Sequence, residues 1–284
     1  MTTEGGDDRT AQAASGQASG NGKSRAELEI DRIEHMINSG DMKRLRQRSR
    51  EQTRQTGERI VPKNAATIVL LRGRPGHEEI IMGRRNRNLK FMPGALVFPG
   101  GRVDPGDWRV PAADPLHADV RAKLLANMRG RSGERSAHGL GIAAIRELYE
   151  ETGFLIGRET GLVPGHRDWA AYAKRRMAPS LSGLRLLSRA ITPPGMPRRF
   201  DTWFFVTRLE DHHHEPDEGF VHSSELEELR WIAPEAAMGE DTREITRVML
   251  VELMNRLRED PGLDPSFPAP CYITVRDRFH RTLL

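Results

Sequence analysis

Residues 146–154, which read Arg-Glu-Leu-Tyr-Glu-Glu-Thr-Gly-Phe, decide the fold and the chemistry that we expect of this chain. They continue an apolar repeat with helical spacing, so the sequence predicts a helix over 142–152. Gly153 is of the residue type that most readily ends a helix, and it marks the expected end of this one. The buried side of the helix is expected to carry Ile142, Ile145 and Leu148.

Three carboxylates share another face of this helix, because Glu147, Glu150 and Glu151 are separated by three, four and one residues. Like charges at this spacing repel each other, so such a set is either a solvated surface or a cation site. Mg²⁺ and Mn²⁺ prefer oxygen ligands, and Mg²⁺ usually shares its carboxylates with substrate phosphates. The helix alone leaves both interpretations open.

A glycine-rich segment upstream favours the cation site. Residues 98–107 read FPGGRVDPGD, in which Gly100 and Gly101 allow tight turns and a close approach of backbone N–H groups to a phosphate. A backbone that accepts phosphate, combined with a cluster of carboxylates, is what metal-assisted cleavage of a diphosphate requires.

Together the two segments resemble the signature of the Nudix hydrolase superfamily, G-x5-E-x7-R-E-U-x-E-E-x-G-U, in which U is apolar. The helix half matches at every defined position from Arg146 to Phe154. The first half matches as Gly101, with Asp107 in place of the usual Glu. The spacer is 108–145 rather than seven residues, so we expect an insertion at about 108–140.

The segment before the signature narrows the resemblance. Arg84, Arg85 and the run FMPGALVFPGG at 91–101 are similar to coenzyme A diphosphatase-like members, some of which also split the signature with an insertion. This resemblance implies hydrolysis of a nucleoside diphosphate derivative, with coenzyme A or acyl-coenzyme A favoured. A dinucleotide or RNA-end pyrophosphatase and a non-catalytic Nudix-fold nucleotide sensor are the alternatives. The intact carboxylate set argues against the sensor.

The resemblance also implies a role for each matched residue. Glu147, Glu150 and Glu151 would hold Mg²⁺ or Mn²⁺, and Arg146 would orient them. Catalysis would depend on Glu147, Glu150 and Arg146, with one of these glutamates or a later acid as the general base. The other candidates are Gly100, Gly101, Arg84 and Arg85 for the small-molecule diphosphate substrate, and Asp107 and Glu225 as further acids. Arg84, Arg85 and Glu225 could equally be solvated charges.

Mixed strand and helix patterns predict an α+β fold, and the resemblance makes it a Nudix-type α/β/α sandwich with a mixed β-sheet and a helical insertion. The expected strands are 66–72, 79–83, 95–98, 202–209 and 229–232, and a helix is expected at 242–257. The segment 169–190 is expected to be mostly helical, with a break around 179–183. The expected organisation is a disordered tail (1–23), a basic helical appendage (24–60), the Nudix domain (61–260) and a C-terminal extension (261–284).

Composition excludes several classes of protein. The mean hydropathy is −0.60 and no apolar run is long enough for a membrane span. The first residues contain no apolar stretch of the secretory type, and the single Cys271 excludes an internal disulfide or a multi-cysteine metal site. We therefore expect a cytoplasmic protein without a membrane partner.

The net charge of +4 is unevenly distributed. Residues 43–59 contain seven basic and two acidic side chains, so the rest of the chain is almost neutral. This basic segment has no aromatic residues that could stack on bases, and nucleic acid is not an expected partner. The sequence leaves open whether the protein forms a homodimer.

Overall fold

The computed structural model describes most of the chain beyond residue 59. The described residues are 60–89, 92–130, 133–161, 164–194, 196, 198–209, 213–214, 223–275 and 278–284, with a few isolated positions between 28 and 51. The expected tail 1–23 and most of the expected appendage 24–60 lie outside the described residues.

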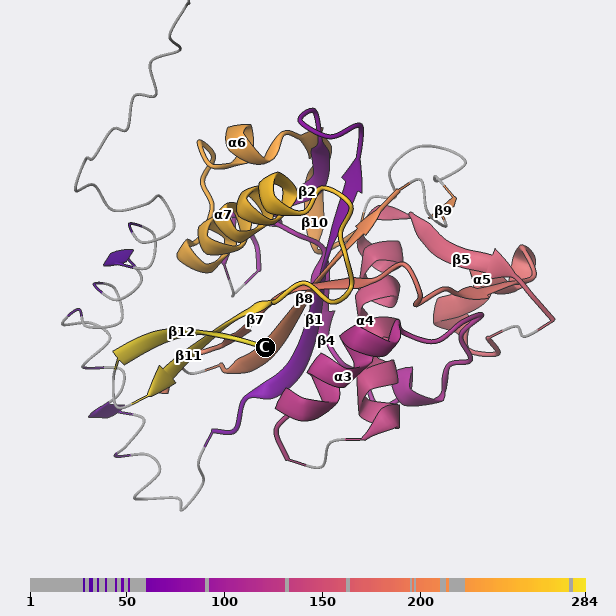
Figure 1. The fold of residues 1–284 in the computed structure, drawn as a ribbon, viewed down its shortest axis with the longest axis horizontal. Coiled ribbons are helices and arrows are strands. Elements are labelled where there is room, and N and C mark those ends of the chain that lie inside the picture. Colours follow the sequence, from indigo (N-terminus) through magenta and orange to yellow (C-terminus); the bar gives the residue numbers. More distant parts are fainter. Residues whose placement is uncertain are drawn as a thin grey trace, which may run out of the picture.

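A large mixed sheet forms the centre of the molecule, in the order β10-β2-β1-β8-β7-β11-β12, with β3 beside β2 and β4 beside β1 (Figure 1). The pairs β1–β8 and β7–β11 are parallel and the other pairs are antiparallel, which confirms the mixed sheet. The strands are β1 Lys63–Arg72, β2 Glu79–Arg85, β3 Leu96–Val97, β4 Gly100–Arg102, β7 Arg185–Ile191, β8 Phe200–Arg208, β10 Leu226–Ile232, β11 Pro270–Val275 and β12 Arg278–Leu283.

Helices cover both faces of this sheet, as Figure 1 shows for α3 (Ala118–Asn127) and α4 (Glu134–Thr152) on one side and α6 (Pro234–Ala237) and α7 (Glu244–Glu259) on the other. Strand β1 explains the two layers, because its successive side chains point to opposite faces. Ile68 and Leu70 join the apolar cluster under α4, whereas Val69 and Leu71 join the cluster under α7. The expected α/β/α sandwich is therefore confirmed.

The segment 169–190, expected to be mostly helical, is mainly extended, so that prediction is wrong. A 3₁₀ turn η2 (Arg167–Trp169) and a short helix α5 (Ala170–Lys174) lead into β6 (Met177–Pro179) and then β7. Strand β7 lies between β8 and β11 and is buried on both sides, so its leucines do not alternate with polar residues. A continuous apolar run of this kind cannot be told from a buried helix by periodicity. Strand β6 pairs with β5 (Leu155–Glu159), which also pairs with β9 (His213–His214).

The insertion contains a 3₁₀ turn η1 (Asp107–Arg109), the helix α3 and the first turns of α4, which begins eight residues earlier than the sequence predicted. Partly buried polar contacts fix it to the body of the domain. Asp114 accepts hydrogen bonds of 2.7 Å from the Ser180 hydroxyl and the Leu181 N–H, and Lys123 donates to the Pro265 carbonyl. The insertion is therefore a packed part of the layer that carries α4.

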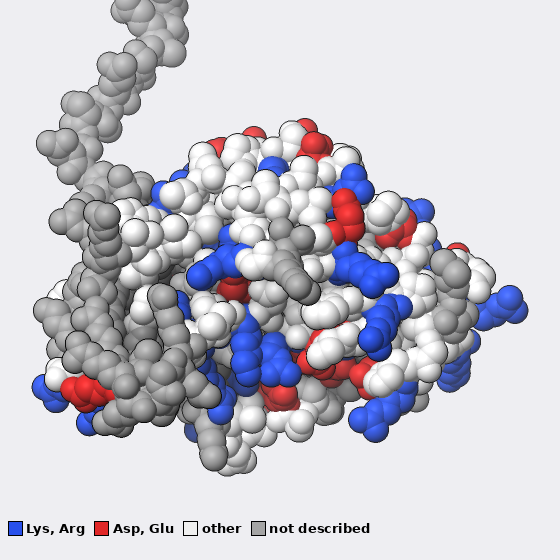
Figure 2. Space-filling model, turned by 90° about the horizontal axis from the view of Figure 1, so that it is seen from below, with Lys and Arg blue, Asp and Glu red and all other residues white. Residues whose placement is uncertain are grey.

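On the face in Figure 2, basic and acidic side chains are interspersed over the described residues. No helix among the described residues is both long enough and apolar enough to span a membrane.

Candidate active site

The carboxylates of α4 are held by a helix that is anchored on its opposite side. Ile142, Ile145 and Leu148 are fully buried, as the sequence predicted. The helix ends at Thr152, and Gly153 adopts a left-handed conformation with φ of 84° while its N–H bonds to the Tyr149 carbonyl. The glutamates differ in exposure, since the side chains of Glu147 and Glu150 are 14% and 37% exposed and Glu151 is 4% exposed.

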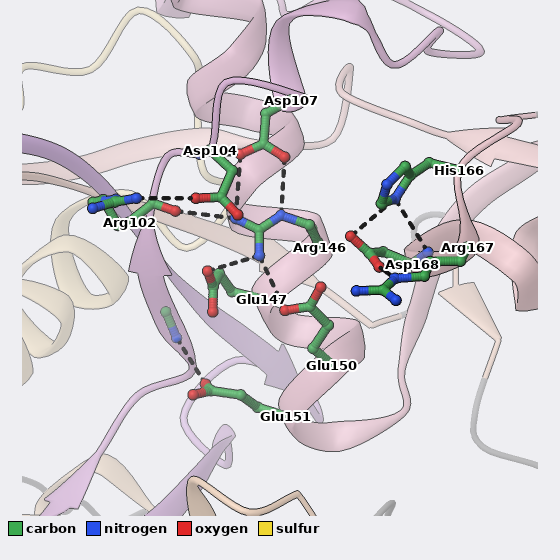
Figure 3. Close-up of polar contacts among 11 residues, drawn as sticks. Arg102, Asp104, Asp107, Arg146, Glu147, Glu150, Glu151, His166, Arg167 and Asp168 are labelled. Atoms are coloured by element: carbon green, nitrogen blue, oxygen red, sulfur yellow. Dashed lines mark hydrogen bonds and ion pairs between the residues drawn. The ribbon is translucent and has the colours of Figure 1, made fainter.

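Arg146 is the centre of the polar contacts in this region (Figure 3). Its Nη1 donates to Glu147 Oε1 at 2.9 Å and to Glu150 Oε2 at 3.0 Å. Its Nε and Nη2 bind the two oxygens of Asp107, and Nη2 also donates to the Arg102 carbonyl. A buried guanidinium with this many fixed acceptors sets the positions of both glutamates.

The glycine segment meets the glutamates at strand β4. The N–H of Gly100 donates to Glu151 Oε2 at 2.9 Å. A Cβ on Gly101 would overlap the carboxylate of Glu147, so only a glycine lets β4 approach this side chain as it stands. The sequence placed these two segments in one site on the strength of the resemblance, and the structure brings them together.

Burial and mutual repulsion make these carboxyl groups hard to ionise. Burial raises the pKa of Glu147 to about 7; Arg146 opposes the shift, and the nearby charges of Glu150 and Glu225 add to it. Burial, with the charge of Glu147, raises the pKa of Glu151 well above its usual value, although the Gly100 N–H acts against it. Burial also raises the pKa of Glu150, whose charge Arg146 partly compensates. A bound cation would relieve the repulsion between these carboxylates and favour their ionised forms.

Arg84 and Arg85 are separated by the geometry of β2, because successive residues on a strand point to opposite faces. Arg84 donates to Glu228 at 2.9 Å, to the Gly94 carbonyl at 2.9 Å and to Glu240 at 3.2 Å, so its charge is already compensated. Arg85 lies 3.6 Å from Glu225, and its charge lowers the pKa of Glu151. The structure thus brings Arg85 and Glu225 to the edge of the α4 cluster and leaves Arg84 apart from it.

Two acidic residues, Asp107 and Asp168, make contacts in the site that the sequence did not predict. Asp107 was a candidate acid of the signature, but its carboxylate is 2% exposed and is bound by Arg146. Asp168, which follows His166 at the start of η2, lies near Glu150 (Figure 3) and its charge raises the pKa of that glutamate. His166 Nδ1 is 3.0 Å from Asp168 Oδ2. No local pattern marks Asp168, because the fold brings it to α4.

The chemistry of the donors fits Mg²⁺ or Mn²⁺, since Glu147, Glu150 and Glu151 all offer carboxylate oxygens. Within the described part of the chain, no three acidic, histidine or cysteine side chains converge as a ready-made set of ligands. Arg146 draws Glu147 and Glu150 toward itself, while Glu151 turns to Gly100. A cation at this face would have to redirect these oxygens away from their present donors.

Comparison with known proteins agrees with this geometry. Residues 135–253 match the NUDIX domain family, and the match begins near the start of α4. Over these residues the chain is therefore similar to the Nudix hydrolase superfamily.

Two curated relatives are similar to part of the chain. The putative nudix hydrolase 7 of Caenorhabditis elegans is 29% identical over 63% of this chain and 54% of its own length. The acyl-coenzyme A diphosphatase NUDT19 of Gallus gallus is 32% identical over 45% of this chain and 39% of its own length. The chain therefore spans about half or less of these relatives. Among solved structures, a NUDIX hydrolase from Alicyclobacillus acidocaldarius aligns with a TM-score of 0.47 and 24% identity, covering 77% of this chain and 88% of that one.

Proposed function

We propose that this protein is a divalent-metal-dependent hydrolase that cleaves the diphosphate bond of a nucleoside diphosphate derivative. The observation that carries the proposal is the arrangement around Arg146, which holds Glu147 and Glu150 beside the glycine strand. A purely structural acidic surface would not need a buried guanidinium to orient it. Mg²⁺ or Mn²⁺, when bound, would neutralise the charge of the diphosphate and activate the attacking water.

The other steps of the proposed reaction depend on side chains and glycines around α4 and β4. Gly100 lets β4 lie against Ala66 and Thr67 of β1, and Gly101 lets β4 approach the Glu147 carboxylate. Arg146 keeps the glutamates from rotating away, and Arg85 supplies a positive charge at the edge of the cluster. Water adds to one phosphorus, the bridging P–O bond breaks, and the other phosphate leaves. One of the α4 glutamates, or a later acid, takes the proton of the attacking water.

Coenzyme A or an acyl-coenzyme A is the favoured substrate. The support is the run at 84–101, which resembles coenzyme A diphosphatase-like proteins, and the similarity to the acyl-coenzyme A diphosphatase of Gallus gallus. A matched panel tests this: coenzyme A, an acyl-coenzyme A, a dinucleoside polyphosphate and a 5′-capped RNA, each with Mg²⁺ or Mn²⁺. Release of a phosphomonoester fastest from the coenzyme A compounds is the expected result.

The variant Glu150→Gln keeps the size of the side chain and removes its charge. It should lower kcat by at least a hundredfold, whereas Glu159→Gln, at the exposed end of β5, should leave kcat unchanged. Binding of nucleotides without turnover of any compound would favour the sensor instead. Turnover of capped RNA alone would favour RNA-end processing.

A further inference from the structure

A cavity of about 270 Å³ opens within the insertion, between the segment that precedes α4 and the first turns of α4, away from the glutamates along the helix. Its lining includes Trp108, Leu116, Arg121, Arg135, His138 and Leu181. Gly139, beside this cavity, lies seven residues before Arg146. At 1.5 Å per residue this separation is about 10 Å along the helix axis. The cavity is therefore within one nucleoside length of the proposed site of cleavage.

Trp108 gives this cavity a flat aromatic wall. The indole lies directly against Gly139, where an added Cβ would overlap Cδ1 and come within 2.9 Å of Nε1. Trp108 is nevertheless 48% exposed, while Trp169 and Trp203 are 2% and 1% exposed. One side of the indole is thus supported by α4 and much of the ring is left uncovered. An exposed indole at a cavity, held by a glycine, is suited to stacking.

The rim of the cavity is positively charged. Arg121 lies 3.6 Å from Glu134, the one acid of the lining. Arg135 is exposed and has no ion-pair or hydrogen-bond partner among the residues that the structure describes. Two guanidinium groups against one carboxylate leave an excess positive charge, which suits an anionic group such as a phosphate.

The apolar residues that line the cavity favour a nucleobase over an aliphatic chain as the ligand. Leu116 and Leu181 are 6% and 0% exposed, so they offer almost no further apolar surface to a ligand. The apolar surface that remains is mainly the ring of Trp108, flanked by arginines. A ligand with a heteroaromatic ring and a phosphate would match both the exposed ring of Trp108 and the positive charge of the arginines.

We propose that this cavity binds the nucleoside end of the substrate, with the base stacked on Trp108 and a phosphate on the ribose bound by Arg121 and Arg135. The assignment rests on the proposed function, which places the diphosphate at Glu147 and Glu150. Trp108 directly follows Asp107, so one short turn carries both the stacking wall and the partner of Arg146.

Adenosine 3′,5′-bisphosphate tests the cavity without catalysis, because it has no diphosphate bond to hydrolyse. Titration calorimetry on the full chain should show binding that Trp108→Ala weakens at least tenfold and Trp108→Phe weakens far less. Arg135→Gln should weaken the bisphosphate several-fold more than adenosine 5′-monophosphate. Arg74→Gln, in the exposed turn after β1, should change neither. For hydrolysis, Trp108→Ala should raise KM with little change in kcat.

Two outcomes separate this inference from the proposed function. Binding that depends on Trp108, without hydrolysis of any diphosphate, would uphold the cavity and overturn the hydrolase. The assignment of the cavity would be overturned if Trp108→Ala left the KM for coenzyme A unchanged. It would also be overturned if the wild type and Trp108→Ala bound the bisphosphate equally well. An unchanged denaturation midpoint for Trp108→Phe shows that the fold is intact.

Discussion

Arg146 and Asp107 form a bidentate ion pair, in which the Nε and Nη2 atoms of the arginine lie 2.9 and 3.2 Å from the two carboxylate oxygens. Both side chains are almost fully buried, at 6% and 2% exposure. The pair joins the turn after the glycine strand to the middle of α4, across 39 positions of sequence. It therefore fixes the glycine strand and the glutamates relative to each other, in spite of the insertion between them.

Asp107→Asn should weaken both stability and catalysis. The amide keeps the shape of the side chain but removes the charge that balances the buried guanidinium. Because Arg146 retains Glu147 and Glu150, the expected loss in the free energy of unfolding is about 1–3 kcal/mol, below that of a completely broken buried pair. Arg146 would also shift toward the glutamates, so kcat should fall at least tenfold. Guanidinium denaturation and steady-state kinetics measure the two effects.

Asp104→Asn is the matched control, since Asp104 lies in the same turn with a side chain that is 55% exposed and 3.7 Å from Arg102. Exposed pairs of this kind contribute little, so neither the unfolding midpoint nor kcat should change. If Asp107→Asn behaved like this control, the ion pair would have no part in positioning the glutamates.

Gly101→Ala should reduce activity, because the atoms nearest to the new Cβ all belong to Glu147. The new Cβ would overlap the Glu147 carboxylate, which must then move away from the glycine strand. We expect kcat to fall at least tenfold while the protein still folds, as judged by circular dichroism. Gly106→Ala is the control, because its φ of −76° suits alanine and nothing lies within 4 Å of the new Cβ. Equal activities for the two variants would show that Glu147 has no defined position.

The helix and its carboxylates could be predicted from the sequence because their spacing alone places them on one face. The partner of Arg146 could not, since Asp107 meets it only through the path of the insertion. Arg84 and Arg85 looked equivalent as neighbours, and only the pleat of β2 shows that Arg84 is bound by Glu228 and Glu240. Strand β7 could not be predicted either, because it is buried on both sides and its continuous apolar run resembles a buried helix.

Asp114→Ala should loosen the insertion. This carboxylate accepts hydrogen bonds from the Leu181 and Ser182 N–H groups, both at 2.7 Å, and its loss leaves those donors without their acceptor. An unsatisfied buried donor costs about 1–3 kcal/mol, so the free energy of unfolding should fall by that order. Asp119→Ala, on the exposed side of α3, should cost less. Hydrogen exchange over 114–127 that is no faster in Asp114→Ala would contradict the anchoring.

The raised pKa of Glu147 predicts how metal-free protein responds to pH. The folded state binds a proton with a pKa of about 7, against 4.5 for the ordinary carboxyl. The folded state therefore holds more protons between these values, and stability falls as pH rises from about 4.5 to 7. The contribution is at most about 3 kcal/mol at pH 8. Denaturation in the presence of a chelator, at pH 5 and pH 8, measures it.

Glu147→Gln tests this effect, because the amide does not titrate; removing the charge of Glu147 also removes one cause of the raised pKa of Glu151. The variant should lose less stability than the wild type between pH 5 and pH 8. Mg²⁺ or Mn²⁺ should stabilise the wild type more at pH 8 than at pH 5, since a cation binds the ionised carboxylates and not the protonated ones. If metal raised the unfolding midpoint equally at both pH values, or equally in Glu147→Gln, it would be bound somewhere other than this face of α4.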